Sequence, residues 1–179
     1  MNKSQYKKFD LDILKMGYFI LYKSSGGFFY NQITKEQIKR GFSKEDSLFI
    51  HIETSGGGPY SVAVIAPIIK VVNICEKHTD RYIKIVRFKG EDYDRKRYKV
   101  AFWSASACNR RYDWFGVLRF KFKLFFQMPW RHFCSENCLW ALQKEYSEAL
   151  EIAPADCLPA DFLNERFFDV IWEGRINDK

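Results

Sequence analysis

A predicted β-hairpin in the first third of the chain constrains the fold more than any other feature. The apolar, β-favouring run 48–54 is followed by the turn 55–59, which contains three consecutive glycines, and then by the apolar run 60–65. Two such runs joined by a glycine-rich turn predict adjacent antiparallel strands. Any fold for this chain must therefore include an antiparallel sheet.

Further strands are predicted on both sides of this hairpin. They are expected from β-favouring apolar composition or from alternation of apolar and polar residues. The runs concerned are 17–22, 69–74, 82–88 and a closing strand at 168–172. Together with the hairpin they predict an antiparallel sheet or a small open barrel.

Helical spacing takes over after Gly90. Apolar residues recur at helical intervals over 94–108, and a second helix is expected from Cys134 to about Leu150. A shorter helix is predicted over 34–40, with Thr34 as its N-cap, Gln37 completing a capping box and Gly41 ending it. Pro159–Leu163 is expected to form a short helical turn. The fold class expected is α+β, with the sheet packed against helices.

The chain is expected to form one domain over residues 1–179, with 1–12 as a polar lead-in. Its apolar fraction of 47% and aromatic fraction of 18% predict a well-packed core and argue against disorder. No linker, repeat or low-complexity segment interrupts the sequence. A single core is the simplest organisation for this length.

The net charge of +7 permits an anionic partner, such as a membrane surface, nucleic acid or a cell-wall polymer, and selects none of them. The basic segments 95–99 and 119–123 are where such a partner would bind. A lysine-rich, solvated surface explains the same charge more simply. We therefore expect no specific nucleic-acid partner, and the oligomeric state is left open.

The five cysteines have no regular spacing, and an odd count argues against a disulfide framework. A reducing compartment fits such cysteine usage. We find no signal peptide, and the apolar stretch around 13–22 is too short to span a bilayer. These features favour a cytoplasmic location.

Cys134 is the first residue of a predicted helix and is the strongest candidate for a reactive side chain in the sequence. Ser135 and Glu136 suit a helix start, and apolar residues follow at 138, 139, 141 and 142. The unpaired N–H groups and the positive dipole end of a helix N-terminus lower the pKa of a thiol placed there. Such a cysteine is a candidate nucleophile, which then requires a base.

Three histidines are available as that base. His132 lies two residues before Cys134 and does not easily reach back to it, and His78 falls in a polar turn that predicts a solvated side chain. His51 lies within an apolar strand and is followed two positions later by Glu53. Positions i and i+2 of a strand share a face, so Glu53 is placed to orient the His51 imidazole. The alternative is a half-exposed strand that carries His51, Glu53 and Thr54 on or near a solvent face.

An ordered set of four motifs resembles a known family. The motifs are His51-Ile52-Glu53, Tyr112-Asp113-Trp114, Phe133-Cys134-Ser135-Glu136 and Pro159-Ala160-Asp161-Phe162-Leu163. In this order they resemble the circularly permuted NlpC-type papain-fold amidases and peptidases, in the YiiX/YebB-like branch. The resemblance spans about residues 17–172. It implies a permuted papain-like fold in which the histidine strand precedes the nucleophile helix, and a bacterial or phage origin suits this branch.

The resemblance also implies roles for individual residues. Cys134 would be the nucleophile and His51 the base, with Glu53 as the third catalytic residue or Ser61 in its place. Ser61, Tyr112 and Trp114 are the candidate substrate contacts. A competing register aligns 59–61 with the family's lead to the histidine and puts Val62 where the histidine belongs, which would make the protein catalytically inactive.

The activity expected is that of a thiol hydrolase or acyltransferase on an amide or ester bond in cell-wall peptide, lipid or protein. A Cys-His mechanism needs no metal or organic cofactor. Two alternatives remain open. One is an inactive binding module for an anionic or cell-envelope partner. The other is a zinc site made of His132, Cys134 and Cys138, for which the sequence offers no fourth ligand.

Overall fold

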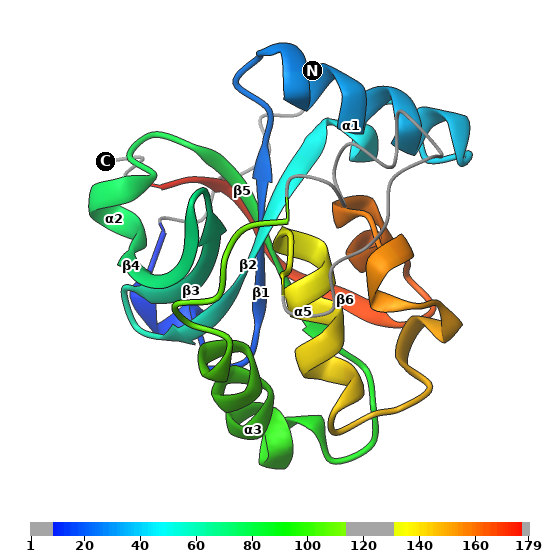
Figure 1. The fold of residues 1–179 in the computed structure, drawn as a ribbon. Coiled ribbons are helices and arrows are strands. Elements are labelled where there is room, and N and C mark those ends of the chain that lie inside the picture. The colour runs from blue at the N-terminus through cyan, green and yellow to red at the C-terminus, as the bar shows by residue number, and fades with distance from the viewer. Residues whose placement is uncertain (1–8, 114–130, 177–179) are drawn as a thin grey trace, which may run out of the picture.

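The computed structural model describes residues 9–113 and 131–176, which form an α+β fold around an open, six-stranded antiparallel sheet (Figure 1). The strand order is β4-β3-β2-β1-β5-β6. The strands are β1 Phe19–Lys23, β2 Phe49–Gly57, β3 Tyr60–Ile65, β4 Ile68–Asn73, β5 Tyr82–Phe88 and β6 Phe168–Arg175. The hairpin and the other predicted strands are thereby confirmed.

Strand β1 lies between β2 and β5, so the first strand of the chain becomes the centre of the sheet. The side chains of 19–22 are fully buried, which shows that both faces of β1 are covered. A run of four apolar residues with no polar alternation suits such a doubly covered strand. The pairing sets Tyr22 directly opposite His51 of β2.

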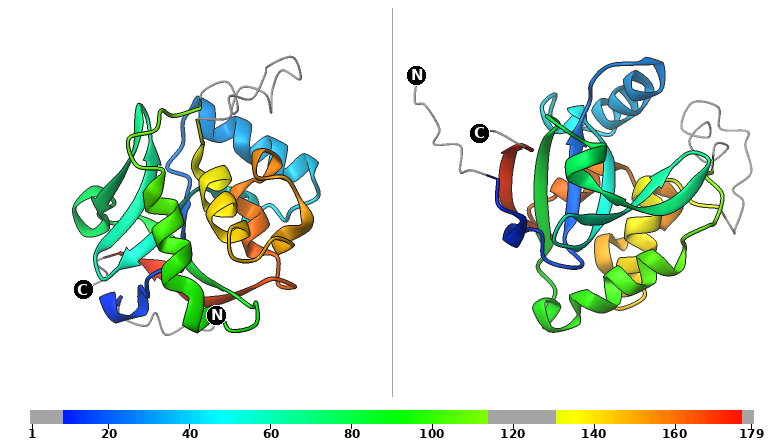
Figure 2. Two further views of the ribbon diagram at one scale, coloured as in Figure 1. Left: turned by 60° about the horizontal axis from the view of Figure 1, so that its bottom comes forward. Right: turned by 90° about the vertical axis from the view of Figure 1, so that its left-hand side faces the viewer.

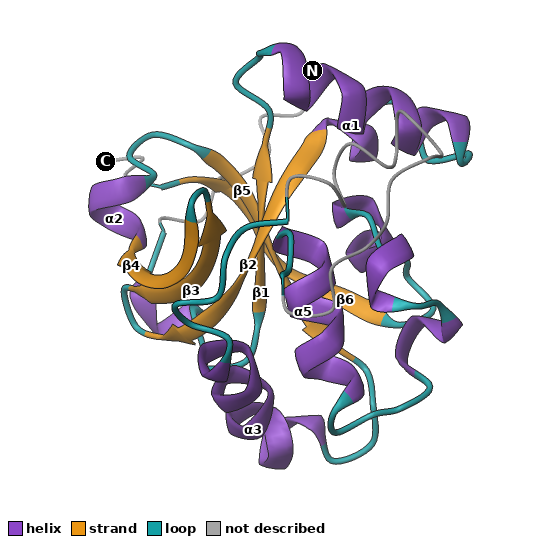
Figure 3. Cartoon of the chain, viewed as in Figure 1, coloured by secondary structure: helices purple, strands orange, loops and turns teal. Residues whose placement is uncertain are grey.

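Helices α1 Phe28–Lys39, α3 Tyr93–Ser106 and α5 Cys134–Gln143 lie to one side of the sheet (Figure 2). The short helix α2 Ile74–Lys77 links β4 to β5. The other helical pieces among the described residues are 3-10 turns, seen beside the longer helices in Figure 3. Their bounds are Leu11–Ile13, Asp46–Leu48, Ala149–Glu151, Pro154–Asp156 and Pro159–Leu163.

Helix α5 packs its apolar residues against β2 and α3. Cys138, Leu139 and Leu142 are buried in the core, and the Thr54 hydroxyl donates a hydrogen bond to Cys138 Sγ at 3.3 Å. At the start of the helix, Glu136 Oε2 accepts the backbone N–H of Phe133 at 3.2 Å. This cap satisfies one of the N–H groups that a helix start leaves unpaired, and it fixes the position at which the helix begins.

Helix α5 ends at Gln143 rather than near Leu150 as predicted. The Gln143 side chain donates hydrogen bonds to the carbonyls of Ala149 and Ile152, both at 2.9 Å. The chain after the helix therefore folds back over its last turn. Leu150 and Glu151 adopt positive φ values, which a continuing helix excludes.

Helix α1 begins at Phe28, six residues before the predicted N-cap Thr34. The glycine pair 26–27 marks the true start, since both glycines have positive φ. Gln37 forms no capping box. It is buried, and its amide donates to the carbonyls of Ser47 and Phe49 at 2.9 and 3.1 Å. The predicted stop is correct, because the helix ends at Lys39 and Gly41 follows at φ +94°.

Within the described residues, no helix combines the length and the apolar character that crossing a bilayer requires.

Candidate active site

Cys134 is the first residue of α5, and its side chain is almost completely buried. Burial opposes ionisation of the thiol. A hydrogen bond to His51, attraction to that imidazole, and the backbone N–H groups of Ile52 and Ser135 outweigh burial and lower the pKa of Cys134. His51 is thus the main cause of the lowered Cys134 pKa, Ile52 of β2 contributes a backbone N–H, and the helix start contributes that of Ser135.

The four other cysteines have the opposite environment. Burial raises the pKa of Cys75, Cys108, Cys138 and Cys157, and nearby negative groups add to the effect at Cys75, Cys138 and Cys157. None of the five forms a disulfide. Cys134 is therefore the only cysteine of this chain whose surroundings favour the thiolate.

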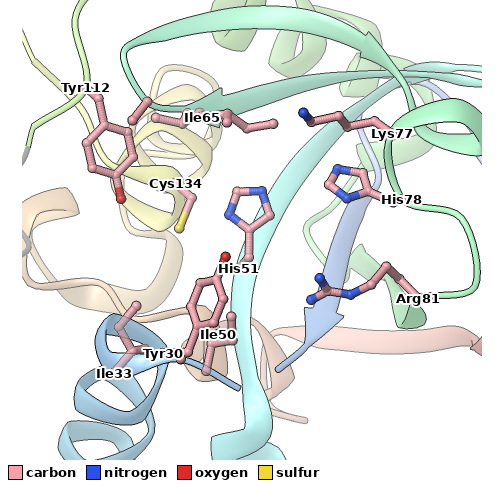
Figure 4. Close-up of a pocket in the computed structure, with 13 residues that line it drawn as sticks. Tyr30, Ile33, Ile50, His51, Ile65, Lys77, His78, Arg81, Tyr112 and Cys134 are labelled. Atoms are coloured by element: carbon pink, nitrogen blue, oxygen red, sulfur yellow. The ribbon is translucent and has the colours of Figure 1, made fainter. Parts of the chain in front are cut away.

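His51 lies on β2 between the thiol and a carboxylate. Burial alone would lower its pKa, but hydrogen bonds to Cys134 and Glu53 and attraction to both raise the pKa of the His51 imidazole to about 10. Its Nε2 lies 3.0 Å from Glu53 Oε1. Because a carboxylate only accepts, Nε2 carries the proton of this bond, which leaves Nδ1 as the nitrogen available to the thiol. Figure 4 shows the Cys134 sulfur facing the His51 ring.

Glu53 is completely buried, yet each of its oxygens accepts two hydrogen bonds. Oε1 accepts from His51 at 3.0 Å and from His78 at 2.8 Å. Oε2 accepts from the hydroxyls of Tyr22 at 2.9 Å and Ser61 at 2.6 Å. Burial alone would raise the pKa of Glu53, but the hydrogen bonds and charges of the two histidines hold it well below its usual range. The carboxylate is therefore ionised and fixed.

The two residues proposed as alternatives for the third catalytic position act together in the structure. Glu53 contacts the histidine directly, and Ser61 on the neighbouring strand holds Glu53. The reason lies in the sheet register. Thr54 pairs with Val62, so Glu53 and Ser61 project to the same face as diagonal neighbours.

His78 is not the solvated loop residue that its polar surroundings predict. Its side chain is only 11% exposed, its Nε2 donates to Glu53, and its ring packs on that of Tyr22 with centroids 4.2 Å apart. It directly follows helix α2, where its backbone N–H bonds the Ile74 carbonyl at 2.8 Å. No local pattern connects positions 78 and 53, because only the return of the chain after β4 brings them together.

A cleft of about 570 Å³ opens beside Cys134 and His51 (Figure 4). Figure 4 shows Tyr30 and Ile33 of α1, Ile65 of β3 and Tyr112 on the side of the thiol, and Lys77, His78 and Arg81 on the other side of the His51 ring. The cleft has a volume suited to a small ligand or a segment of a larger one.

The predicted substrate contacts have different positions. Tyr112 lines the cleft, and burial followed by the charge of Cys134 raises the pKa of its hydroxyl. Ser61 is buried behind Glu53 and is not among the residues that line the cleft. Trp114 lies outside the described residues. Val62, the residue of the competing register, is buried in the core and lines no part of the cleft.

The histidine and cysteines of the zinc alternative do not converge. His132 Nδ1 lies 3.1 Å from Asn137 Oδ1, and its ring packs on Trp140. Cys138 is bonded by Thr54. A different donor set, made of His51, Glu53 and His78, has its ligand atoms within 4.8 Å of one another, and two histidines with a carboxylate suit zinc. The two hydrogen bonds that these histidines donate to Glu53 account for the cluster without a cation.

The basic segment of α3 has acidic neighbours. Arg95 pairs with Asp92 at 2.7 Å, Arg97 with Asp94 at 4.0 Å, and Lys99 with Glu145 at 3.5 Å. These pairs offset the positive charge that the sequence places at 95–99. The second basic segment, 119–123, lies outside the described residues.

A scan against protein-family models and searches of curated proteins and of solved structures found no match. The function is therefore inferred from the chemistry of the site itself.

Proposed function

We propose that this protein is a cysteine-dependent hydrolase or acyltransferase that acts on an amide or ester bond. The observation that supports it most strongly is that His51 is hydrogen-bonded to both Cys134 and the buried Glu53, and that Cys134 and His51 line a cleft. A thiol at a helix start, a base hydrogen-bonded to it and a third group orienting that base are the parts that nucleophilic catalysis requires.

In the proposed reaction, the Cys134 thiolate attacks the carbonyl carbon of the bound substrate. The carbonyl oxygen becomes an oxyanion, for which the backbone N–H at the start of α5 supplies part of the hole. As the tetrahedral species collapses, the bond to the leaving group breaks and the His51 imidazolium gives that group a proton. The products of this half-reaction are a thioester on Cys134, a neutral imidazole and the free amine or alcohol.

The second half-reaction restores the enzyme. Neutral His51 takes a proton from water, or from an acceptor amine or alcohol, as that molecule attacks the thioester carbonyl. Collapse releases the acid or the new acyl product and returns the thiolate and the imidazolium. Glu53 keeps the imidazole in one orientation and stabilises its positive charge throughout, as the carboxylate does in other nucleophile–histidine–acid sites.

The fold proposed with this function is a permuted papain-like one. Its support is the order of the parts along the chain, because the histidine strand β2 precedes the nucleophile helix α5. The family resemblance implies Cys134 as the nucleophile and His51 as the base, and the hydrogen bond between these two residues supports the same roles.

Alkylation with iodoacetamide tests the proposal. At pH 7, limiting reagent should modify Cys134 before the other four cysteines, as read by peptide mass spectrometry. Modification should slow in His51→Ala, and hydrolysis of p-nitrophenyl acyl esters should be lost in Cys134→Ser. Equal modification of all five cysteines, or esterase activity that survives in Cys134→Ser, would contradict the proposal. Salt-sensitive binding to anionic vesicles that is unchanged in Cys134→Ser would instead favour a binding module.

A further inference from the structure

The cleft has two chemically different ends, separated by His51 (Figure 4). Around the Cys134 sulfur the side chains are apolar or aromatic, and on the far side of the His51 ring they are basic. The two ends lie near different parts of a bound substrate, because the nucleophile Cys134 and the proton donor His51 occupy different positions along the cleft.

The end at Cys134 suits an apolar acyl group. Ile33, Ile50 and Ile65 contribute aliphatic surface, and the rings of Tyr30 and Tyr112 complete the wall. A carbonyl carbon bonded to the sulfur would place its acyl chain among these side chains. Transfer of an aliphatic chain from water to such a surface is favourable by about 0.8 kcal/mol for each buried methylene group.

The other end suits an anion. Lys77 and Arg81 line it, and the described residues that line the cleft include no aspartate or glutamate. Arg81 is held in place by hydrogen bonds to the Lys23 carbonyl at 2.6 Å and the Ser25 hydroxyl at 3.3 Å. Lys77 Nζ has no hydrogen-bond or ion-pair partner among the residues that the structure describes, so its ammonium group is free to contact a ligand.

The mechanism sets which part of the substrate meets this basic end. His51 protonates the leaving group, so the leaving atom lies next to the His51 ring, and the remainder of the leaving group extends away from the sulfur. Beyond His51 in that direction lie His78, Lys77 and Arg81. An anion carried by the leaving group would therefore meet two cations, whereas an anion on the acyl group would lie among aliphatic side chains.

We infer that the substrate is an amide or ester with an apolar acyl group and a leaving group that carries a carboxylate or a phosphate. The inference rests on the proposed function and adds the substrate class. Lys77 and Arg81 are then specificity-determining residues that contact the leaving group and take no part in bond making.

Matched substrates test the charge preference. N-octanoylglycine and N-octanoylglycinamide differ only in the leaving-group carboxylate, and N-octanoyl-O-phosphoethanolamine and N-octanoylethanolamine only in the phosphate. Release of the amine gives kcat/KM for each, with p-nitrophenyl octanoate as a substrate whose leaving group needs no anion contact. The anionic member of at least one pair should be preferred by about tenfold or more, as expected for a charge-assisted contact. The pair with the larger ratio distinguishes carboxylate from phosphate.

Variants locate the preference. Lys77→Gln and Arg81→Gln should each reduce the ratio, mainly by raising KM for the anionic substrate, and should change p-nitrophenyl octanoate hydrolysis by a smaller factor than hydrolysis of the anionic substrate. Lys44→Gln, an exposed lysine that is not among the cleft-lining residues, is the matched control and should change neither. Lys77 is itself exposed, so its variant should fold even if loss of the Arg81 hydrogen bonds disturbs the protein.

The outcomes separate the two proposals. Cys134-dependent hydrolysis of p-nitrophenyl octanoate with equal rates within both matched pairs would overturn this inference and leave the proposed function standing. A preference that persists unchanged in both Lys77→Gln and Arg81→Gln would also overturn it. Absence of any Cys134-dependent hydrolysis, the ester included, would overturn the proposed function and this inference with it.

Discussion

His78 Nε2 lies 2.8 Å from Glu53 Oε1, although 25 positions separate the two residues in the chain. The same oxygen accepts the proton of His51 Nε2 at 3.0 Å. Two imidazoles thus share one carboxylate oxygen, and only one of them faces the thiol. In the reaction proposed above, His78 is therefore a positioning residue that acts through Glu53.

The first prediction concerns His78 itself. Replacement by alanine should let water from the cleft reach Glu53, weaken its attraction for the His51 imidazolium and slow iodoacetamide labelling of Cys134 at pH 7 by roughly three- to tenfold. Glutamine retains an N–H donor of similar reach, so His78→Gln should keep most of the wild-type rate. Equal losses in both variants, or no loss in alanine, would contradict this role.

The second prediction concerns the charge of Glu53. In Glu53→Gln the imidazolium of His51 loses its buried counter-ion, so the turnover of an acyl ester should fall by about 10²-fold or more. Glu53→Ala should in addition lower the free energy of unfolding by about 3–5 kcal/mol, because it leaves a network of buried donors without their acceptor. Denaturant titration measures the free energy of unfolding. If Glu53→Ala is as stable as the wild type, the buried hydrogen bonds to Glu53 do not contribute to stability as described.

The third prediction is the pH dependence. The pKa of Cys134 is lowered from its ordinary value of 9.0, and that of His51 is raised to about 10. The thiolate is lost as the pH falls through the lowered Cys134 pKa, and the imidazolium loses its proton as the pH rises through about 10. The labelling rate should therefore reach half its maximum below pH 9, and ester hydrolysis should decline on the alkaline side near pH 10.

A variant of His51 supplies the control for this profile. In His51→Ala the thiol keeps its burial and loses the imidazole, so the labelling midpoint should move above that of the wild type. An unmoved midpoint would mean that the helix start alone activates the cysteine.

The fourth prediction concerns Tyr22 and Ser61. Tyr22→Phe and Ser61→Ala each remove one donor to Glu53 Oε2, and a buried carboxylate that loses a donor is less stable in its charged form. Each substitution should destabilise the protein by about 1–3 kcal/mol and have a smaller effect on labelling than Glu53→Gln. The Tyr22 ring also packs on His51 and His78, and phenylalanine retains that packing.

The fifth prediction is that chelators do not change the activity. A Cys-His mechanism uses no metal, so prior dialysis against EDTA should leave Cys134-dependent ester hydrolysis unchanged. Loss of activity that is restored by added Zn²⁺ would assign the His51, Glu53 and His78 donor set to a cation instead.

The strands and the helix start at Cys134 could be predicted because their signals are local. Alternating or β-branched apolar runs identified each strand, and capping residues identified the start of α5. The pairing of His51 with Glu53 was equally accessible, since positions i and i+2 of a strand share a face. The start of α1 was missed because the capping pattern at Thr34 outweighed the glycine pair at 26–27, which is the true boundary.

The rest of the site depends on tertiary placement. Tyr22 reaches Glu53 only because β1 pairs with β2, and His78 reaches it only because α2 returns the chain beside β1. Neither residue has a local neighbour in sequence that marks it as functional. A polar turn such as 76–80 predicts exposure. The buried Glu53 carboxylate that accepts the hydrogen bond of His78 lies 25 positions earlier in the sequence, where no local pattern connects it to the turn.

The order in which the site is assembled along the chain has a consequence for synthesis. Tyr22, His51, Glu53, Ser61 and His78 all precede β5, while Cys134 follows only after α3 and the segment beyond it. During translation, every residue that is hydrogen-bonded to the buried Glu53 carboxylate is therefore synthesised before Cys134. A growing chain, or one truncated after β5, contains His51 and its hydrogen-bond partners but lacks the proposed nucleophile, so the proposed acyl transfer requires a chain that extends through α5.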